Sequence, residues 1–285
     1  MNLALNSMVY EAGNVDAKRM LRKAKDFGFT YIDFNAWRSG DPGEMSRQDR
    51  QEIVALFRDL GLRSSQMLLI GTRGVASADP KVRAGVQEYM RSCAEFQLEL
   101  GGREVLVCWG AGVYETGVDR EVTWGRSVEA VRNYAEWCLE RAILVEMELD
   151  PHVYFVLSNL YEMVKMLEAV NLPNVFPNVD IGHLCITREG PKTLEKISNR
   201  ILHVHISETD TFEHTNSIIG TGKADIRSYI DKVVELGMEG NCRKHGVSPV
   251  VGIEMGEPGR HVDDPDRWVR ESLDYLKTAV PELRP

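Results

Sequence analysis

Two kinds of segment alternate along the chain: short runs rich in apolar residues, and longer stretches in which apolar residues recur at helical spacing. The short runs predict β-strands, and the longer stretches predict amphipathic α-helices. The predicted strands cover residues 2–8, 31–35, 64–70, 104–110, 143–149, 175–180, 200–207 and 249–255. The predicted helices cover residues 16–28, 46–61, 79–101, 123–142, 158–170, 190–198, 225–237 and 264–280. The pattern therefore predicts eight successive strand–helix units.

This order of elements decides the expected fold. Strands that are separated by helices pair in parallel through right-handed crossovers. Eight such units in 285 residues predict an α/β protein with a (β/α)8 TIM barrel. An open doubly wound sheet is the alternative, but the turn after the first predicted strand has no GxGxxG motif. No low-complexity linker divides the chain, so we expect one domain spanning residues 1–285.

Composition and charge narrow the class of protein. With 43% hydrophobic and 27% charged residues, the chain has the composition of a globular protein. No apolar run is long enough for a membrane-spanning helix, and the first residues lack the features of a signal peptide, so we expect a cytoplasmic protein with no membrane partner. The net charge of -9 disfavours a nucleic-acid partner, which usually requires a basic surface. The five cysteines include no CxxC pair and indicate reduced, mostly buried thiols.

Polar residues at the ends of the predicted strands locate the chemistry. In a (β/α)8 barrel the site lies at the carboxyl ends of the strands. The first four predicted strands end on groups of modest reactivity: Asn6, Asn35, Gln66 and Trp109. All seven histidines lie from His152 onward, so imidazole chemistry is confined to the second half of the chain.

The last four predicted strands end on carboxylates and imidazoles. These residues are Glu146, Glu148 and Asp150, then Asp180 and His183, then His203, His205 and Glu208, and finally Glu254. Burying several carboxylates without a counter-charge is costly, so this group predicts a divalent cation site. An oxygen-rich set with one imidazole suits Mn²⁺ best, with Mg²⁺, Co²⁺ or Zn²⁺ as alternatives.

The two-residue period of a strand ranks the candidate ligands. Glu146 and Glu148 share a face, but Glu148 lies nearer the carboxyl end, and the same holds for His205 over His203. We therefore expect Glu146 and His203 to lie one layer deeper in the barrel. The predicted metal ligands are Glu148, Asp180, His205 and Glu254.

The order of these residues resembles the xylose isomerase-like superfamily of sugar and sugar-phosphate isomerases and epimerases. The pattern is most similar to ketose 3-epimerases and hydroxypyruvate isomerase-like proteins. The motifs that carry the resemblance are Glu148, "DIGH" (180–183), the second histidine of "HVH" (203–205), Glu254 and the turn "GTGKAD" (220–225).

The chain departs from the ketose 3-epimerase pattern in two places. Those proteins have a substrate-binding arginine six residues after the metal-binding histidine, where this chain has Thr211, with His214 nearby. The segment 237–249 also lengthens the last connection. We expect both departures to touch the mouth of the site, so the metal-binding residues stay intact but the identity of the substrate is left open.

The resemblance implies a metal-dependent isomerase or epimerase of a small carbohydrate, which would be a ketose, a sugar phosphate or a hydroxy-keto acid. Glu148 and Glu254 would act as acid and base through an enediolate, and many relatives are dimers or tetramers. His183 would bind a substrate oxygen or hold Asp180. Trp109 could form an apolar wall of the site, and Lys223 could reach an anionic substrate.

Other functions use the same barrel. After the same proton abstraction, loss of a β-leaving group would give a lyase or dehydratase of a keto-sugar, keto-glycoside or cyclic keto-acid. The absent arginine and the long last connection keep this alternative open. An abasic-site endonuclease would need more histidine ligands and a basic groove, and a non-catalytic barrel would leave the carboxylates without a role.

Overall fold

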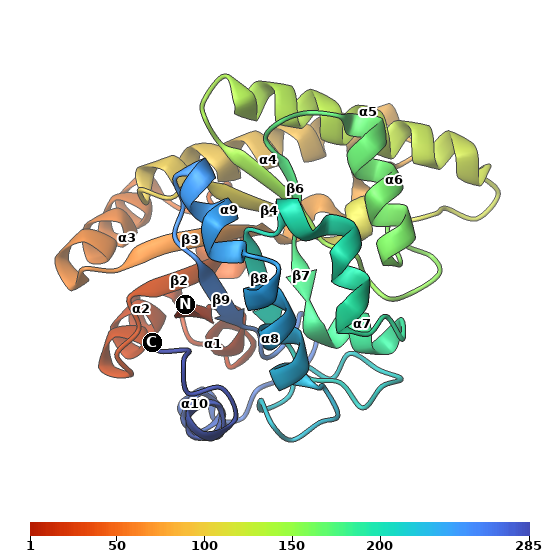
Figure 1. Cartoon of the computed structure of the whole chain (residues 1–285). Coiled ribbons are helices and arrows are strands. Elements are labelled where there is room, and N and C mark those ends of the chain that lie inside the picture. The colour runs from red at the N-terminus through yellow and green to blue at the C-terminus, as the bar shows by residue number, and fades with distance from the viewer.

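The computed structural model describes residues 1–285, and its core is one sheet of parallel strands in the order β6-β5-β4-β3-β2-β1-β9-β8-β7 (Figure 1). The strands are β1 Asn2–Asn6, β2 Tyr31–Asn35, β3 Arg63–Leu69, β4 Glu104–Val107, β5 Leu144–Met147, β6 Val175–Pro177, β7 Val179–Asp180, β8 His203–Ile206 and β9 Val250–Ile253. β6 pairs with β5, whereas β7 pairs with β8, and only Asn178 separates β6 from β7. Together these two short strands fill one position of the ring, so the nine strands make the eight positions of a TIM barrel, as predicted.

Helices surround the strands on the outside (Figure 1). The α-helices are α1 Met8–Ala12, α2 Ala17–Asp26, α3 Arg47–Leu60, α4 Pro80–Glu99, α5 Arg120–Leu139, α6 Leu160–Val170, α7 Ile181–Ile186, α8 Ile226–Glu235, α9 Met238–His245 and α10 Pro265–Ala279. The 3-10 helices are η1 Arg38–Gly40, η2 Ile70–Gly74, η3 Trp109–Ala111 and η4 Pro191–Arg200. Side-chain caps set several starts: Ser46, for example, accepts a 3.0 Å hydrogen bond from the backbone N–H of Asp49 at the start of α3.

Apolar side chains between the sheet and the helices form one cluster of 71 buried residues. The inner face of the sheet also carries buried polar side chains such as Asp33 and Glu146. The polar groups that matter for function therefore point into the barrel. No helix combines the length and the apolar character that crossing a bilayer requires.

The structure corrects one expectation about the segment 237–249. Most of it forms α9, which contacts α8 and η4. Residues 246–248 then line a cavity together with Tyr31, Arg63 and Glu104, the first residues of β2, β3 and β4. This cavity lies at the amino end of the barrel, so the long last connection is on the face opposite the predicted site and not at its mouth.

Candidate active site

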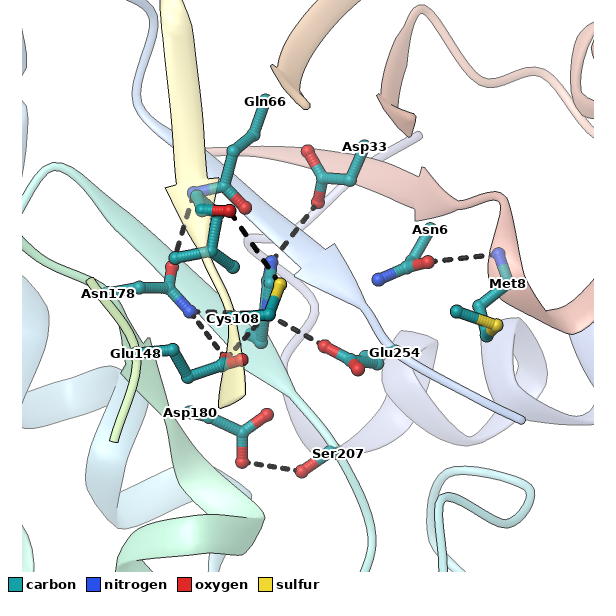
Figure 2. A network of polar contacts seen from close by, with 12 residues as sticks. Asn6, Met8, Asp33, Gln66, Cys108, Glu148, Asn178, Asp180, Ser207 and Glu254 are labelled. Atoms are coloured by element: carbon teal, nitrogen blue, oxygen red, sulfur yellow. Dashed lines mark hydrogen bonds and ion pairs between the residues drawn. The ribbon is translucent and has the colours of Figure 1, made fainter. Parts of the chain in front are cut away.

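The four predicted metal ligands meet at the carboxyl end of the barrel. Glu148, Asp180, His205 and Glu254 each offer a ligand atom, and these atoms all lie within 4.8 Å of one another. Asp180 ends β7 and His205 lies in β8, while Glu148 and Glu254 directly follow the last residues of β5 and β9. Figure 2 shows the carboxylates of Glu148, Asp180 and Glu254 around one common space. The parallel barrel thus gathers side chains that are more than a hundred residues apart in sequence.

The two ring nitrogens of His205 face different groups. Its Nδ1 lies 3.3 Å from Glu148 Oε1 and 2.8 Å from Glu254 Oε2. Its Nε2 lies 3.8 Å from Asp33 Oδ2, deeper in the barrel, and makes no hydrogen bond. Nδ1 is therefore the atom that faces the two glutamates and would bind a metal ion with them.

The donors around Asp180 test whether a metal ion fits. Asp180 Oδ1 accepts hydrogen bonds from Ser207 Oγ at 2.6 Å and from the backbone N–H of His183 at 2.7 Å. Asp180 Oδ2 is buried and has no partner. A buried carboxylate oxygen without a partner is costly, and a divalent cation beside Glu148 and His205 would satisfy it. Three carboxylates and one imidazole fit Mn²⁺ or a similar ion.

The charges of the cluster also indicate that it requires a cation. Burial opposes the charged form of Asp180, yet the neighbouring His183 and the Ser207 hydrogen bond hold its pKa below the usual value. Burial raises the pKa of Glu254, against the opposing effect of His205. Burial would lower the pKa of His205, but Glu254 and Glu148 hold it well above the ordinary value. Without a metal ion, a proton on His205 supplies the positive charge that these carboxylates require.

Asn178 contacts two of the predicted ligands, and the sequence analysis missed it. Its Nδ2 donates to Glu148 Oε1 at 2.9 Å and lies 3.2 Å from His205 Nδ1. Gln66 Nε2 in turn donates to Asn178 Oδ1 at 3.4 Å. The only signal in the sequence is a polar amide between apolar residues in the predicted strand "VFPNVD". Figure 2 shows this amide beside the Glu148 carboxylate.

A cavity of about 370 Å³ opens above the cluster, and Glu148, Glu254 and His183 line it. Trp109 forms part of its wall and stacks on Phe155 with ring centroids 6.2 Å apart. Its indole N–H donates to the carbonyl of Ile70 at 2.6 Å, which fixes the ring. The wall beside the cluster is therefore a rigid aromatic surface.

A chain of hydrogen bonds connects Asp180 with His183. The Ser207 hydroxyl donates to Asp180, so it must accept from His214 Nε2, 3.2 Å away. His214 Nδ1 then accepts from His183 Nε2 at 3.3 Å, while His183 Nδ1 donates to the carbonyl of Leu149 at 2.6 Å.

Both nitrogens of His183 therefore carry protons. Burial alone would lower the pKa of His183, but Asp180 and Glu148 raise it to about 9. Burial and the charge of His183 lower the pKa of His214 to about 3. His183 is thus the charged member of the pair, and it lines the cavity together with His214. Thr211, at the position of the expected arginine, is not among the lining residues.

Lys223 lies apart from the cavity. Its side chain is exposed and is not among the lining residues, and its backbone N–H donates to the carbonyl of Thr209 at 2.7 Å. The turn that contains Lys223 instead binds the carboxylate of Glu208, whose Oε1 accepts a hydrogen bond from the backbone N–H of Gly220 at 2.6 Å. A Cβ on Gly222 would lie 2.1 Å from Glu208 Oε2, so the turn needs glycine there. A role for Lys223 in binding an anionic substrate stays a prediction.

A family model described as "Xylose isomerase-like TIM barrel" matches residues 21–279. The chain belongs to this family. L-ribulose 3-epimerase of Methylomonas sp. (strain DH-1) is 26% identical over 234 residues, which are 79% of this chain and 76% of that protein. Fructoselysine 3-epimerase of Escherichia coli O157:H7 is 24% identical over 163 residues, 56% of this chain and 55% of that protein. The chain is therefore a distant homologue of ketose 3-epimerases.

Several solved structures have the same fold. D-allulose 3-epimerase from Methylomonas sp., in complex with D-allulose, superposes with a TM-score of 0.75 at 20% identity and covers 98% of this chain and 97% of its own. The IOLI protein with a bound zinc atom superposes with a TM-score of 0.80 at 16% identity and covers 99% of both chains.

Proposed function

We propose that this protein is a divalent-metal-dependent epimerase or isomerase of a small, unphosphorylated ketose. The observation that carries the proposal is the pair of glutamates Glu148 and Glu254, which face the same imidazole at the floor of a cavity. The distant relationship to L-ribulose 3-epimerase and fructoselysine 3-epimerase supports the same reaction class. We take Mn²⁺ as the ion, because the donor set is rich in carboxylate oxygens.

The two glutamates transfer the proton. Glu148 and Glu254 come from β5 and β9, which the β6/β7 position and β8 separate in the ring. They therefore reach a substrate from different sides, so that one carboxylate removes a proton from carbon and the other returns it. A bound divalent ion supplies positive charge beside the oxygens of a hydroxy-ketone and lowers the cost of that proton removal. The charged ring of His183 lines the cavity, where its positive charge favours the negative charge that develops on a substrate oxygen.

The charge of the cavity favours a substrate without a phosphate. Arg260 is the lining arginine, and its Nε lies 2.5 Å from Glu257 Oε1. Its Nη2 is 3.8 Å from Glu213 Oε2, and both glutamates line the same cavity. The arginine is thus already paired with carboxylates. The aromatic wall of Trp109 and Phe155 suits the apolar face of a sugar.

Solvent exchange tests the proposal directly. The chelator-treated protein, reloaded with Mn²⁺, is incubated in D2O with D-allulose, D-tagatose and L-ribulose, and the recovered sugars are analysed by NMR and mass spectrometry. We expect one deuterium at C3 and conversion to the C3 epimer for at least one ketose. Glu254→Gln should reduce turnover at least about 100-fold, whereas Glu271→Gln, on the exposed face of α10, should leave it unchanged.

Two results would change the conclusion. Full turnover by Glu254→Gln would remove that residue from the proton transfer. An unsaturated product, or a cleaved leaving group released from a keto-glycoside, would assign the protein to the lyase alternative, since the same proton removal then ends in elimination.

A further inference from the structure

A second group of buried ionisable side chains lies below the candidate active site. Glu104 begins β4, Glu146 lies in β5 and His203 begins β8, and all three are at most 5% exposed. Each offers a ligand atom, and these atoms lie within 4.8 Å of one another. None of them belongs to the four-residue cluster at the mouth. The barrel therefore contains two layers of carboxylate and imidazole groups.

Three atoms of this deeper group have no hydrogen-bond partner. They are Glu104 Oε1, Glu146 Oε1 and His203 Nδ1, and all are shielded from solvent. Each unsatisfied buried polar atom costs free energy, and the cost is larger for charged groups. Three unsatisfied atoms, on three residues whose ligand atoms lie within 4.8 Å of one another, indicate a missing partner. Two carboxylate oxygens and one imidazole nitrogen share a need for positive charge, which a cation meets.

The histidine is oriented as a metal ligand would be. His203 Nε2 lies 3.0 Å from Asp33 Oδ2, and the other oxygen of Asp33 accepts from Ser65 Oγ at 2.7 Å. A proton on Nε2 that is donated to this carboxylate leaves Nδ1 with a free lone pair. Metal-binding histidines commonly donate their second N–H to a carboxylate in this way. A Cβ on Gly252 would lie 2.0 Å from Asp33 Oδ2, so a glycine makes room for the orienting carboxylate.

A separate opening leads toward this group. A cavity of about 350 Å³ at the amino end of the barrel is lined by Glu104 and Ser65, and Arg63, Arg103 and Ser248 also border it. The mouth cavity opens at the other end. An ion could thus reach Glu104 without passing the substrate site.

We propose that Glu104, Glu146 and His203 bind a second divalent transition-metal ion inside the barrel, with Asp33 as the residue that orients His203. Two carboxylates balance the charge of one such ion, and one imidazole with two carboxylates is a ligand set that Zn²⁺ accepts. This ion would join β4, β5 and β8 across the barrel and stabilise the fold rather than touch substrate.

Counting ions on defined variants tests the proposal. Chelator-treated protein is reloaded with Zn²⁺ alone, dialysed and measured by inductively coupled plasma mass spectrometry. We expect two ions per wild-type chain, one for Glu104→Gln, one for Glu254→Gln and none for the double variant. Circular dichroism checks that each variant is folded.

The wild-type protein provides the decisive measurement, because it does not depend on the folding of any variant. A crystal grown with Zn²⁺ should show two anomalous peaks at the zinc edge, one of them between Glu104, Glu146 and His203. A single peak at the mouth, or a water without anomalous signal in the deeper position, would overturn the proposal. Neither result depends on whether the protein epimerises a ketose.

Discussion

Replacing Asn178 by alanine removes the amide that holds Glu148 in place. In the native protein Asn178 Nδ2 donates to Glu148 Oε1 at 2.9 Å, and the amide oxygen accepts from Gln66. A hydrogen bond to a charged group contributes about 1.5–3 kcal/mol. Loss of a group that orients a metal ligand typically weakens metal binding about 10–100-fold, which is the same range of free energy. We therefore expect Asn178→Ala to bind Mn²⁺ about 10–100-fold more weakly.

Isothermal titration of Mn²⁺ into chelator-treated protein measures this change at one pH and salt concentration. The binding event that Glu254→Gln removes identifies the mouth site in the titration. Asn174→Ala is the matched control, because Asn174 is equally buried and its amide donates to the carbonyls of Ala135 at 2.9 Å and Ile143 at 3.1 Å. We expect this control to lose thermal stability but to keep its affinity for Mn²⁺.

The reasoning would fail if both variants bound Mn²⁺ as the wild type does. In that case Asn178 would serve only the strand, and the position of Glu148 would be set by its backbone alone. It would also fail if Asn174→Ala lost as much affinity as Asn178→Ala, because the loss would then follow from general destabilisation.

Three further predictions concern metal binding and stability. Glu254 and Glu148 raise the pKa of His205 against the effect of burial, so Mn²⁺ must displace a proton from this ring. The affinity of the protein for Mn²⁺ should therefore rise with pH. Calorimetric titrations in two buffers of different ionisation enthalpy should show about one proton released per ion bound. Protein in Mn²⁺ at 100 times its Kd should be more stable than the same protein after chelation of the ion. The free energy of unfolding should differ by about 2.7 kcal/mol, measured as a fall in Tm on chelation. Gly222→Ala should destabilise by about 1–3 kcal/mol in urea unfolding, because its Cβ meets Glu208. Gly85 lies in helix α4, and a Cβ there would meet no other atom, so Gly85→Ala should instead stabilise the protein by about 0.5–1 kcal/mol. Equal effects at both glycines would contradict the steric argument.

The fold followed from local patterns because each strand–helix unit repeats the same alternation. Strand β2 was predicted with its observed ends, and the site layer followed from the rule that parallel strands point their carboxyl ends to one rim. The short helices α1, α7 and α9 were missed, since five to eight residues carry too little periodicity to separate a helix from a loop.

The candidate site was harder to predict where contacts depend on barrel closure. Asp33 and His203 are 170 residues apart, and only the closed ring brings them together. Glu104 begins a predicted strand and so lay outside the search for strand ends. The segment 237–249 was misplaced because its length was considered rather than its position between a helix and a strand, and such connections lie at the amino end of a barrel.

The break at Asn178 also couples the site to folding. β6 pairs on one side and β7 on the other, so this strand position is the seam that closes the ring between β5 and β8. Asp180 lies on one side of the seam, and Asn178, between its two halves, holds Glu148. A folding intermediate with an open seam would have no complete ligand set. The rate at which Mn²⁺ becomes tightly bound during refolding would therefore report the closure of this seam.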